Sequence, residues 1–154
     1  MQVKTGFMRV ALDLAKVSAA KMLDIPVGAC VVFAGKTVST AVNEAVLRCD
    51  PTAHAEILAI SAASKKLATY NLRGATLYTT LEPCSMCAGA IINANITDVV
   101  FGAYNEKEGA AGSLIDLLRD YQTTFGNISV TGGVLEQECS ELLSTFFEKL
   151  RNNC

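Results

Sequence analysis

The residues of this chain that could do chemistry lie in two short segments, His-Ala-Glu and Pro-Cys-Ser-Met-Cys. His54 and Glu56 belong to the first segment, and Cys84 and Cys87 belong to the second. Side chains three positions apart on a helix point the same way, so Cys84 and Cys87 can bind one metal ion. The positive end of a helix also favours the ionised thiolates that a metal requires. This spacing predicts a metal site at the start of a helix.

Zinc is a metal that thiolate and imidazole ligands favour in proteins. With His54 as the third ligand, zinc keeps one tetrahedral position for water, which is typical of a catalytic rather than a structural site. That water becomes acidic enough to supply hydroxide near neutral pH. Glu56 is not needed as a ligand, so we expect it to be the catalytic residue that carries protons beside the metal. The four residues together indicate zinc-dependent hydrolysis, with one zinc ion per subunit.

Two other interpretations of these residues lead to different classes of protein. Cys49, five residues before His54, could close the site as a fourth ligand, and the chain would then be a zinc-stabilised interaction module without catalysis. Cys84 and Cys87 could also be a redox pair of the thioredoxin kind. The redox interpretation explains neither why the only histidine of the chain is His54 nor why a carboxylate lies two residues away.

The spacing of apolar residues predicts alternating helices and strands along the chain. We expect helices over 6–22, 52–66, 114–119 and 137–151, with a further helix that begins at Pro83, and strands over 26–33, 37–42, 75–80, 97–101 and 128–134. Gly35 turns the first strand into the second as a hairpin, and Asp50 is expected to cap the helix that carries His54. Chains with this order of elements form a layered sheet with helices on both faces.

The composition is typical of one folded domain. The chain has 154 residues, of which 51% are hydrophobic and 18% are charged, so disorder is excluded and a subunit interface is expected. The 13 Lys and Arg against 15 Asp and Glu give a net charge of −2, so a polyanionic partner would need a local basic patch. No apolar run reaches the length of a membrane span, and we expect a soluble cytoplasmic protein. Cys30, Cys139 and Cys154 are then expected to be small apolar residues rather than disulfide partners.

The two chemical segments resemble the signature of the zinc nucleobase deaminases, which is H-x-E followed by P-C-x-x-C. Longer stretches of the chain are similar to bacterial tRNA-specific adenosine deaminases, at residues 25–29, 50–57, 80–90, 100–103 and 109–114. The similarity spans nearly the whole chain. It implies one deaminase domain over residues 1–154, of the α/β class, with the three-layer α/β/α cytidine deaminase-like fold and a mixed five-stranded sheet.

The resemblance also implies a reaction and partners. The reaction is hydrolysis of the wobble adenosine of a tRNA anticodon stem-loop to inosine, with release of ammonia. The enzyme would be a cytoplasmic homodimer without a membrane segment, in which the loop at 109–114 contacts the partner subunit. A deaminase of free nucleobases or nucleosides, such as guanine, cytosine or cytidine, is the alternative, and the near-neutral charge of the chain would suit it.

The same resemblance implies further site residues. Asn43 would hydrogen-bond the base, and Ala55 and Pro83 would complete the pocket. The RNA would contact a set of basic and aromatic residues, namely Arg48, Phe146, Phe147, Lys149 and Arg151. Adjacent helix residues cannot both face inward squarely, so one of Phe146 and Phe147 is expected in the core and the other outside as a stacking aromatic residue.

Overall fold

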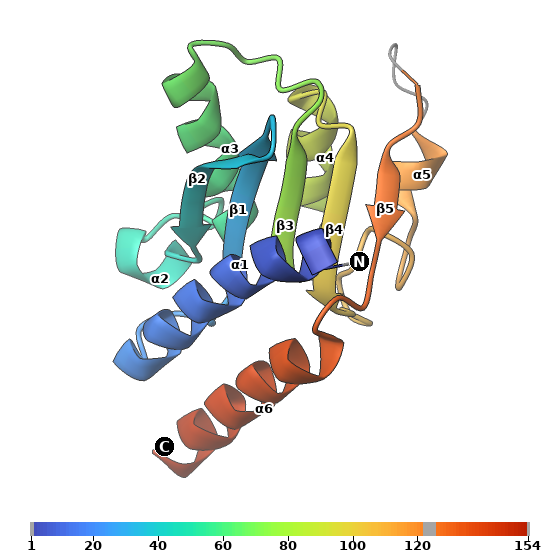
Figure 1. Ribbon diagram of the computed structural model, residues 1–154. Coiled ribbons are helices and arrows are strands. Elements are labelled where there is room, and N and C mark those ends of the chain that lie inside the picture. Colours follow the sequence, from blue (N-terminus) through green and yellow to red (C-terminus); the bar gives the residue numbers. More distant parts are fainter. Residues whose placement is uncertain (1, 122–125, 154) are drawn as a thin grey trace.

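The computed structural model describes residues 2–121 and 126–153 and has a five-stranded sheet at its centre (Figure 1). The strands are β1 Gly28–Phe33, β2 Lys36–Val42, β3 Thr76–Leu81, β4 Asp98–Ala103 and β5 Ser129–Thr131. They lie in the order β2-β1-β3-β4-β5. β1 is antiparallel to β2 and β3, whereas β3, β4 and β5 are parallel to one another, so the sheet is mixed as predicted.

Helices cover both faces of this sheet. They are α1 Gln2–Lys21, α2 Ala45–Arg48, α3 Ala55–Leu67, α4 Ser85–Asn93, α5 Leu117–Asp120 and α6 Glu136–Asn152. α1 and α6 pack on one face, and α3, α4 and α5 lie on the other, which confirms the predicted three-layer arrangement (Figure 1). None of the helices in the described ranges combines the length and the apolar character needed to cross a membrane.

β1 lies between the two helical layers, which explains its nearly continuous apolar sequence. Ala29 and Val31 belong to the core under α3 and α4, whereas Cys30 belongs to the core under α1 and α6. Gly28 lets α1 approach the strand closely, because a Cβ atom there would lie 2.0 Å from the carbonyl oxygen of Ala11. The position of α1 therefore depends on the absence of a side chain at the start of β1.

The helix that carries His54 begins later than predicted. α3 starts at Ala55, and His54 is the extended residue before it, with φ −72° and ψ 151°. The prediction that Asp50 caps this helix is wrong, because its carboxylate accepts hydrogen bonds from the backbone N–H and the hydroxyl of Thr52, at 2.8 and 2.7 Å, and closes a turn. The His54 side chain makes no capping bond either, so its ring is available to the site.

Most other predicted elements are present with shifted ends. α1 extends back to Gln2, and α4 begins at Ser85 because Cys84 is still extended. α5 begins at Leu117 rather than at residue 114, since the preceding residues are tied into a loop by backbone hydrogen bonds to the carbonyl of Gly109. β5 is shorter than predicted, and the short helix α2 is not among the predicted elements.

The buried cysteines outside the metal segment are packing residues. Cys30 and Cys139 are free thiols in the core under α1 and α6, and Cys139 fits there because a Cβ atom at Gly102 would lie 2.4 Å from its sulfur. Burial raises the pKa of Cys30 to about 12 and that of Cys139 to about 11, so both stay protonated at neutral pH. Cys154 lies outside the described residues.

Candidate active site

His54, Cys84 and Cys87 come together where α3 and α4 begin. The Nδ1 atom of His54 lies 3.6 Å from the sulfur of Cys84 and 3.5 Å from the sulfur of Cys87. His54 and Cys84 are the extended residues immediately before their helices, and neither side chain caps its helix. Both side chains are therefore free to meet Cys87, and the predicted group of three ligands is assembled from two helix starts.

The distances within this group fit a zinc ion. Tetrahedral bonds of ~2.3 Å to sulfur and ~2.0–2.1 Å to nitrogen separate the two atoms by ~3.6 Å, which agrees with both His54 distances. Zinc bound there makes water acidic enough to act as a nucleophile near neutral pH. Cys49 is not part of the group, because its exposed thiol donates to the carbonyl of Val46 at 3.8 Å. Within the described ranges, the interpretation with Cys49 as the fourth ligand is therefore wrong.

The pKa values of the two metal-binding thiols are shifted in opposite directions. A hydrogen bond from Cys87 lowers the pKa of Cys84 to about 5, and backbone N–H groups at the start of α4 act in the same direction. The pKa of Cys87 is raised, because its proton is shared with Cys84 and because it is buried beside Glu56. Cys84 is thus prepared to bind a cation as a thiolate, whereas Cys87 releases its proton when a metal binds.

Glu56 lies in the first turn of α3 and is 4% exposed. Burial raises the pKa of its carboxyl group, and the neighbouring Cys84 sulfur adds to this effect while His54 opposes it. The carboxyl group lines the same cavity as His54 but is not one of the three metal ligands. This is a place from which a side chain can take up and deliver protons beside the metal.

His54, Cys84 and Glu56 face a cavity of about 130 Å³. Its wall is built by separate parts of the chain, namely Ile25, Val27, Asn43, His54, Ala55, Glu56, Leu81, Glu82, Cys84, Asn105 and Glu108. Ala55 lines the cavity, and its role in binding stays a prediction. Pro83 is buried, and its carbonyl oxygen accepts a hydrogen bond from the N–H of Ala110 at 2.8 Å. Its neighbour Cys84 lines the cavity, and the role of Pro83 in the pocket stays a prediction.

Asn43 presents an unused hydrogen-bond acceptor. Its side-chain nitrogen donates to a carboxylate oxygen of Asp24 at 3.4 Å and to the carbonyl of Ile25 at 3.3 Å. Its oxygen Oδ1 is buried and has no hydrogen-bond partner among the described residues. A buried polar atom without a partner is costly, so it indicates a place where a ligand supplies the missing donor.

The residues predicted to contact RNA differ in exposure. Phe146 is 4% exposed and packs in the core, so the prediction that it contacts RNA is wrong, whereas Phe147 is 40% exposed. Phe147 lines a groove that shares several residues with the cavity and consists of Ile25, Leu81, Tyr104, Asn105, Glu106, Lys107, Glu108, Glu136, Ser140, Leu143 and Phe147. Lys149 and Arg151 are exposed on the same helix, and Arg48 is exposed and paired with Glu44.

Sequence reasoning missed four residues that shape the cavity, namely Asp24, Glu82, Asn105 and Glu108. Glu82 has a visible signal, because it is a carboxylate directly beside the Pro-Cys-Ser-Met-Cys segment. The other three have no such signal, because no local periodicity or spacing connects them with the metal ligands. Only the packing of the chain brings Asn105 and Glu108 to the cavity and Asp24 to Asn43.

Residues 1–103 match the cytidine and deoxycytidylate deaminase zinc-binding region. The chain belongs to this deaminase family. The deaminase is 47% identical over 145 residues to the tRNA-specific adenosine deaminase of Haemophilus influenzae, a match that covers 94% of this chain and 83% of that protein. It is 43% identical over 145 residues to the tRNA-specific adenosine deaminase of Bacillus subtilis, which covers 94% of this chain and 89% of that protein.

Comparison with solved structures also places the chain among the deaminases. One, from a study of A-to-I editing by tRNA:A34 deaminases at the wobble position of transfer RNA, matches with a TM-score of 0.82 and 39% identity over 90% of this chain and 99% of that chain. A guanine deaminase from Nitrosomonas europaea matches with a TM-score of 0.79 and 27% identity over 92% of this chain and 83% of that chain. The predicted cytidine deaminase-like fold and the zinc cofactor are thereby confirmed, and His54, Cys84 and Cys87 are positioned to hold the ion.

Proposed function

We propose that this deaminase hydrolyses the wobble adenosine of a tRNA anticodon stem-loop to inosine and releases ammonia. One observation carries the proposal: the chain matches tRNA-specific adenosine deaminases over nearly its whole length. The group of three zinc ligands and Glu56, with His54, Cys84 and Glu56 in the wall of one cavity, supply the chemistry that this reaction needs.

Glu56 is the proton carrier in this proposal. Its carboxylate takes a proton from the attacking water and delivers it to the ring nitrogen next to the carbon that bears the amino group. Glu56 then carries the proton of the new hydroxyl group on that carbon to the amino group, which leaves as ammonia when the carbon–nitrogen bond breaks. Water and adenosine are thus converted into inosine and ammonia, and Glu56 returns to its starting state.

Asn43 holds the base in the same proposal. Its side-chain nitrogen is tied to Asp24 and Ile25, which directs Oδ1 away from these partners. Since Oδ1 has no partner among the described residues and Asn43 lines the cavity, it can accept a hydrogen bond from an N–H group of the base. Ala55, also in the cavity wall, borders the base beside Glu56.

The RNA around the target base lies along the groove next to the cavity. The groove shares Asn105 and Glu108 with the cavity, so a strand whose base enters the cavity passes through it. Phe147 offers an exposed ring on which a neighbouring base can stack. Lys149 and Arg151 are exposed cations that can bind phosphate groups, and Arg48 is a third, which would have to leave Glu44 to do so.

We also infer a homodimer that works in the cytoplasm, where its tRNA substrate is found. Leu114 and Ile115 are 59% and 48% exposed, although both are apolar. They border a depression on the surface that also includes His54 and Cys84. A partner subunit seated on this apolar surface would help to shape its neighbour's active site. Light scattering at micromolar concentration tests the inference, and an active monomer would overturn it.

The function is tested with purified, zinc-loaded protein and a set of substrates. The set contains an anticodon stem-loop with a wobble adenosine, the same stem-loop with a wobble guanosine, free guanine, free cytosine and cytidine. We expect inosine in the first stem-loop only, and binding that weakens as salt concentration rises. The similarity to a guanine deaminase makes a free-base deaminase the second candidate. Turnover of free guanine, cytosine or cytidine without turnover of the stem-loop would support that candidate and overturn our proposal.

A further inference from the structure

Glu82 is a buried carboxylate that the proposed reaction steps do not use. It is 1% exposed and lies between the end of β3 and the metal ligand Cys84. Among the described residues, none of the ion pairs includes Glu82. A carboxylate this deeply buried needs hydrogen-bond donors to offset the loss of water.

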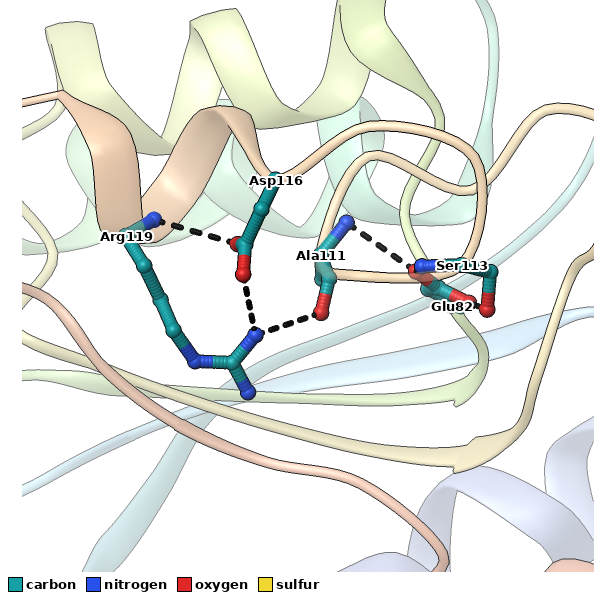
Figure 2. Close-up of polar contacts among 5 residues, drawn as sticks. All are labelled: Glu82, Ala111, Ser113, Asp116 and Arg119. Carbon is teal, nitrogen blue, oxygen red and sulfur yellow. Dashed lines mark hydrogen bonds and ion pairs between the residues drawn. The ribbon is translucent and has the colours of Figure 1, made fainter.

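Residues 105–113 supply those donors. Figure 2 shows Glu82 against Ala111 and Ser113, whose backbone N–H groups both donate to Oε1 at 3.0 Å. The other oxygen, Oε2, accepts from the backbone N–H of Asn105 at 3.0 Å and from the Ser113 hydroxyl. Each carboxylate oxygen thus has two donors from one loop, and charge-assisted bonds of this kind are stronger than neutral ones.

Gly109 shows how closely the loop is fitted to this carboxylate. A Cβ atom at Gly109 would lie 2.5 Å from Cδ and Oε2 of Glu82 and 2.5 Å from the carbonyl oxygen of Asn105. Gly109 also forms an isolated β-bridge with Cys84. The loop is therefore packed against both Glu82 and Cys84, which is one of the three metal ligands.

A second anchor holds the outer side of the same loop. Arg119 donates to the carbonyl of Ala111 at 2.9 Å and pairs with Asp116 at 2.7 Å (Figure 2). This ion pair is partly exposed, unlike Glu82. Both anchors bond to Ala111, but of the two only Glu82 bonds to Asn105. The other hydrogen bonds of Asn105 come from Lys107, Glu108 and Gly109, which belong to the loop itself.

Asn105 and Glu108 in this loop line the cavity together with Glu56. We propose that Glu82 is a positioning residue of the deaminase, because its carboxylate sets the place of Asn105 and thereby the shape of the substrate cavity. The proposal rests on the deaminase function given above. Glu82 also borders the cavity, but both of its oxygens accept hydrogen bonds from the loop, so it acts through Asn105.

The substitution Glu82→Gln should keep some of these hydrogen bonds and remove one. The amide oxygen can keep the two fixed N–H donors of Ala111 and Ser113. The amide nitrogen then faces the Ser113 hydroxyl, which can rotate and accept, and the N–H of Asn105, which cannot. Glu82→Gln therefore removes the bond to Asn105 in particular. Ser113→Ala is the matched control, because it removes one donor from the same oxygen and leaves the bond to Asn105 intact.

The experiment compares wild type, Glu82→Gln and Ser113→Ala by inosine formation, zinc content and amide hydrogen exchange. For Glu82→Gln we expect kcat to fall about tenfold to a hundredfold, because a displacement of about 1 Å near a reaction costs that much. Zinc content should stay at one ion per subunit, and exchange should become faster at Asn105 but not at Ala111. Ser113→Ala should keep kcat within about threefold of wild type.

The proposal is overturned if Glu82→Gln keeps wild-type kcat, if both variants lose activity equally, or if the loss follows a loss of zinc. If Glu82→Gln does not fold, Gly109→Ala tests the same link, since its methyl group would push Asn105 and Glu82 apart. It should reduce kcat similarly, and wild-type kcat would overturn the proposal. A wild-type protein that forms no inosine would overturn the proposed function instead. The exchange comparison at Asn105 would then still decide the role of Glu82.

Discussion

Glu56 and Asn43 have different tasks within one cavity whose wall includes the apolar residues Ile25, Val27 and Leu81. Both side chains are buried, so their polar atoms act in surroundings where water screens them little. In the proposed reaction Glu56 moves protons, and Asn43 accepts a hydrogen bond from the base. Substitution of each residue should therefore affect a different kinetic parameter.

Replacing the catalytic carboxylate should abolish turnover and leave the metal in place. Glu56→Ala is expected to reduce the rate of inosine formation by about a thousandfold or more, because general acid–base catalysis contributes that much. The zinc ligands His54, Cys84 and Cys87 are unchanged, so zinc measured by mass spectrometry should stay at one ion per subunit. An inactive variant that has also lost its zinc would show that Glu56 supports the metal site, and full activity would show that Glu56 is not the proton carrier.

Replacing Asn43 should weaken substrate recognition more than stability. Asn43→Ala removes an acceptor without a protein partner, so we expect kcat/KM on the stem-loop to fall about tenfold to a hundredfold. Asn43→Asp should in addition destabilise the fold by about 1–3 kcal/mol, because two carboxylates would meet where Asn43 now donates to Asp24. Urea unfolding measures this difference. An unchanged kcat/KM in Asn43→Ala would contradict the binding role.

At the scale of elements, the packing of α1 on β1 positions the central strands and hence the end of β3 next to the ligands. Residues 29–32 of β1 pair with β3. The carbonyl oxygen of Ala11 in α1 lies next to Gly28, at the start of β1. The obstacle to a side chain at Gly28 is therefore helix backbone, which cannot turn aside as a flexible side chain can.

Two glycine substitutions test this packing. Gly28→Ala should destabilise the protein by about 2–4 kcal/mol, because a methyl group would overlap the backbone of Ala11. Gly6→Ala is the control, since Gly6 lies in α1 with no atom within 4 Å of the added methyl group, and alanine favours helix by about 1 kcal/mol. Urea midpoints at constant zinc concentration compare the two. Equal midpoints would contradict the close contact between α1 and β1.

At the scale of the whole molecule, the described residues form two hydrophobic cores, one on each face of the sheet, and the metal site lies at the edge of one of them. A chain of 154 residues can bury about two-thirds of its unfolded surface. The fold therefore does not depend on the metal in the way that a small zinc finger does.

Removal of zinc should weaken the protein without unfolding it. After chelation we expect the far-ultraviolet circular dichroism to keep its shape while the thermal midpoint falls by about 10 °C, as for loss of a tightly bound ligand from a domain of this size. Added zinc should restore the midpoint. Complete loss of the circular dichroism signal at room temperature would indicate a zinc-stabilised interaction module instead.

The amino-acid sequence alone determined the metal site and the class of fold. The spacing of Cys84 and Cys87 predicts a shared ion because helix geometry is local, and His54 and Glu56 belong to the same kind of short segment. The alternation of apolar segments likewise predicts the layers, because each element must bury its apolar face. Errors in this part, such as the start of α3, are confined to a few residues at element ends.

Only the tertiary structure decided which distant residues complete the cavity. In the tertiary structure Phe146 is buried, Phe147 is exposed, and Cys49 lies outside the metal group. Asn43 is hydrogen-bonded to Asp24, and residues 105–113 pack against Glu82. None of these contacts follows from periodicity. They arise between segments far apart in the sequence, whose meeting depends on strand order and on the close packing of helices against the sheet.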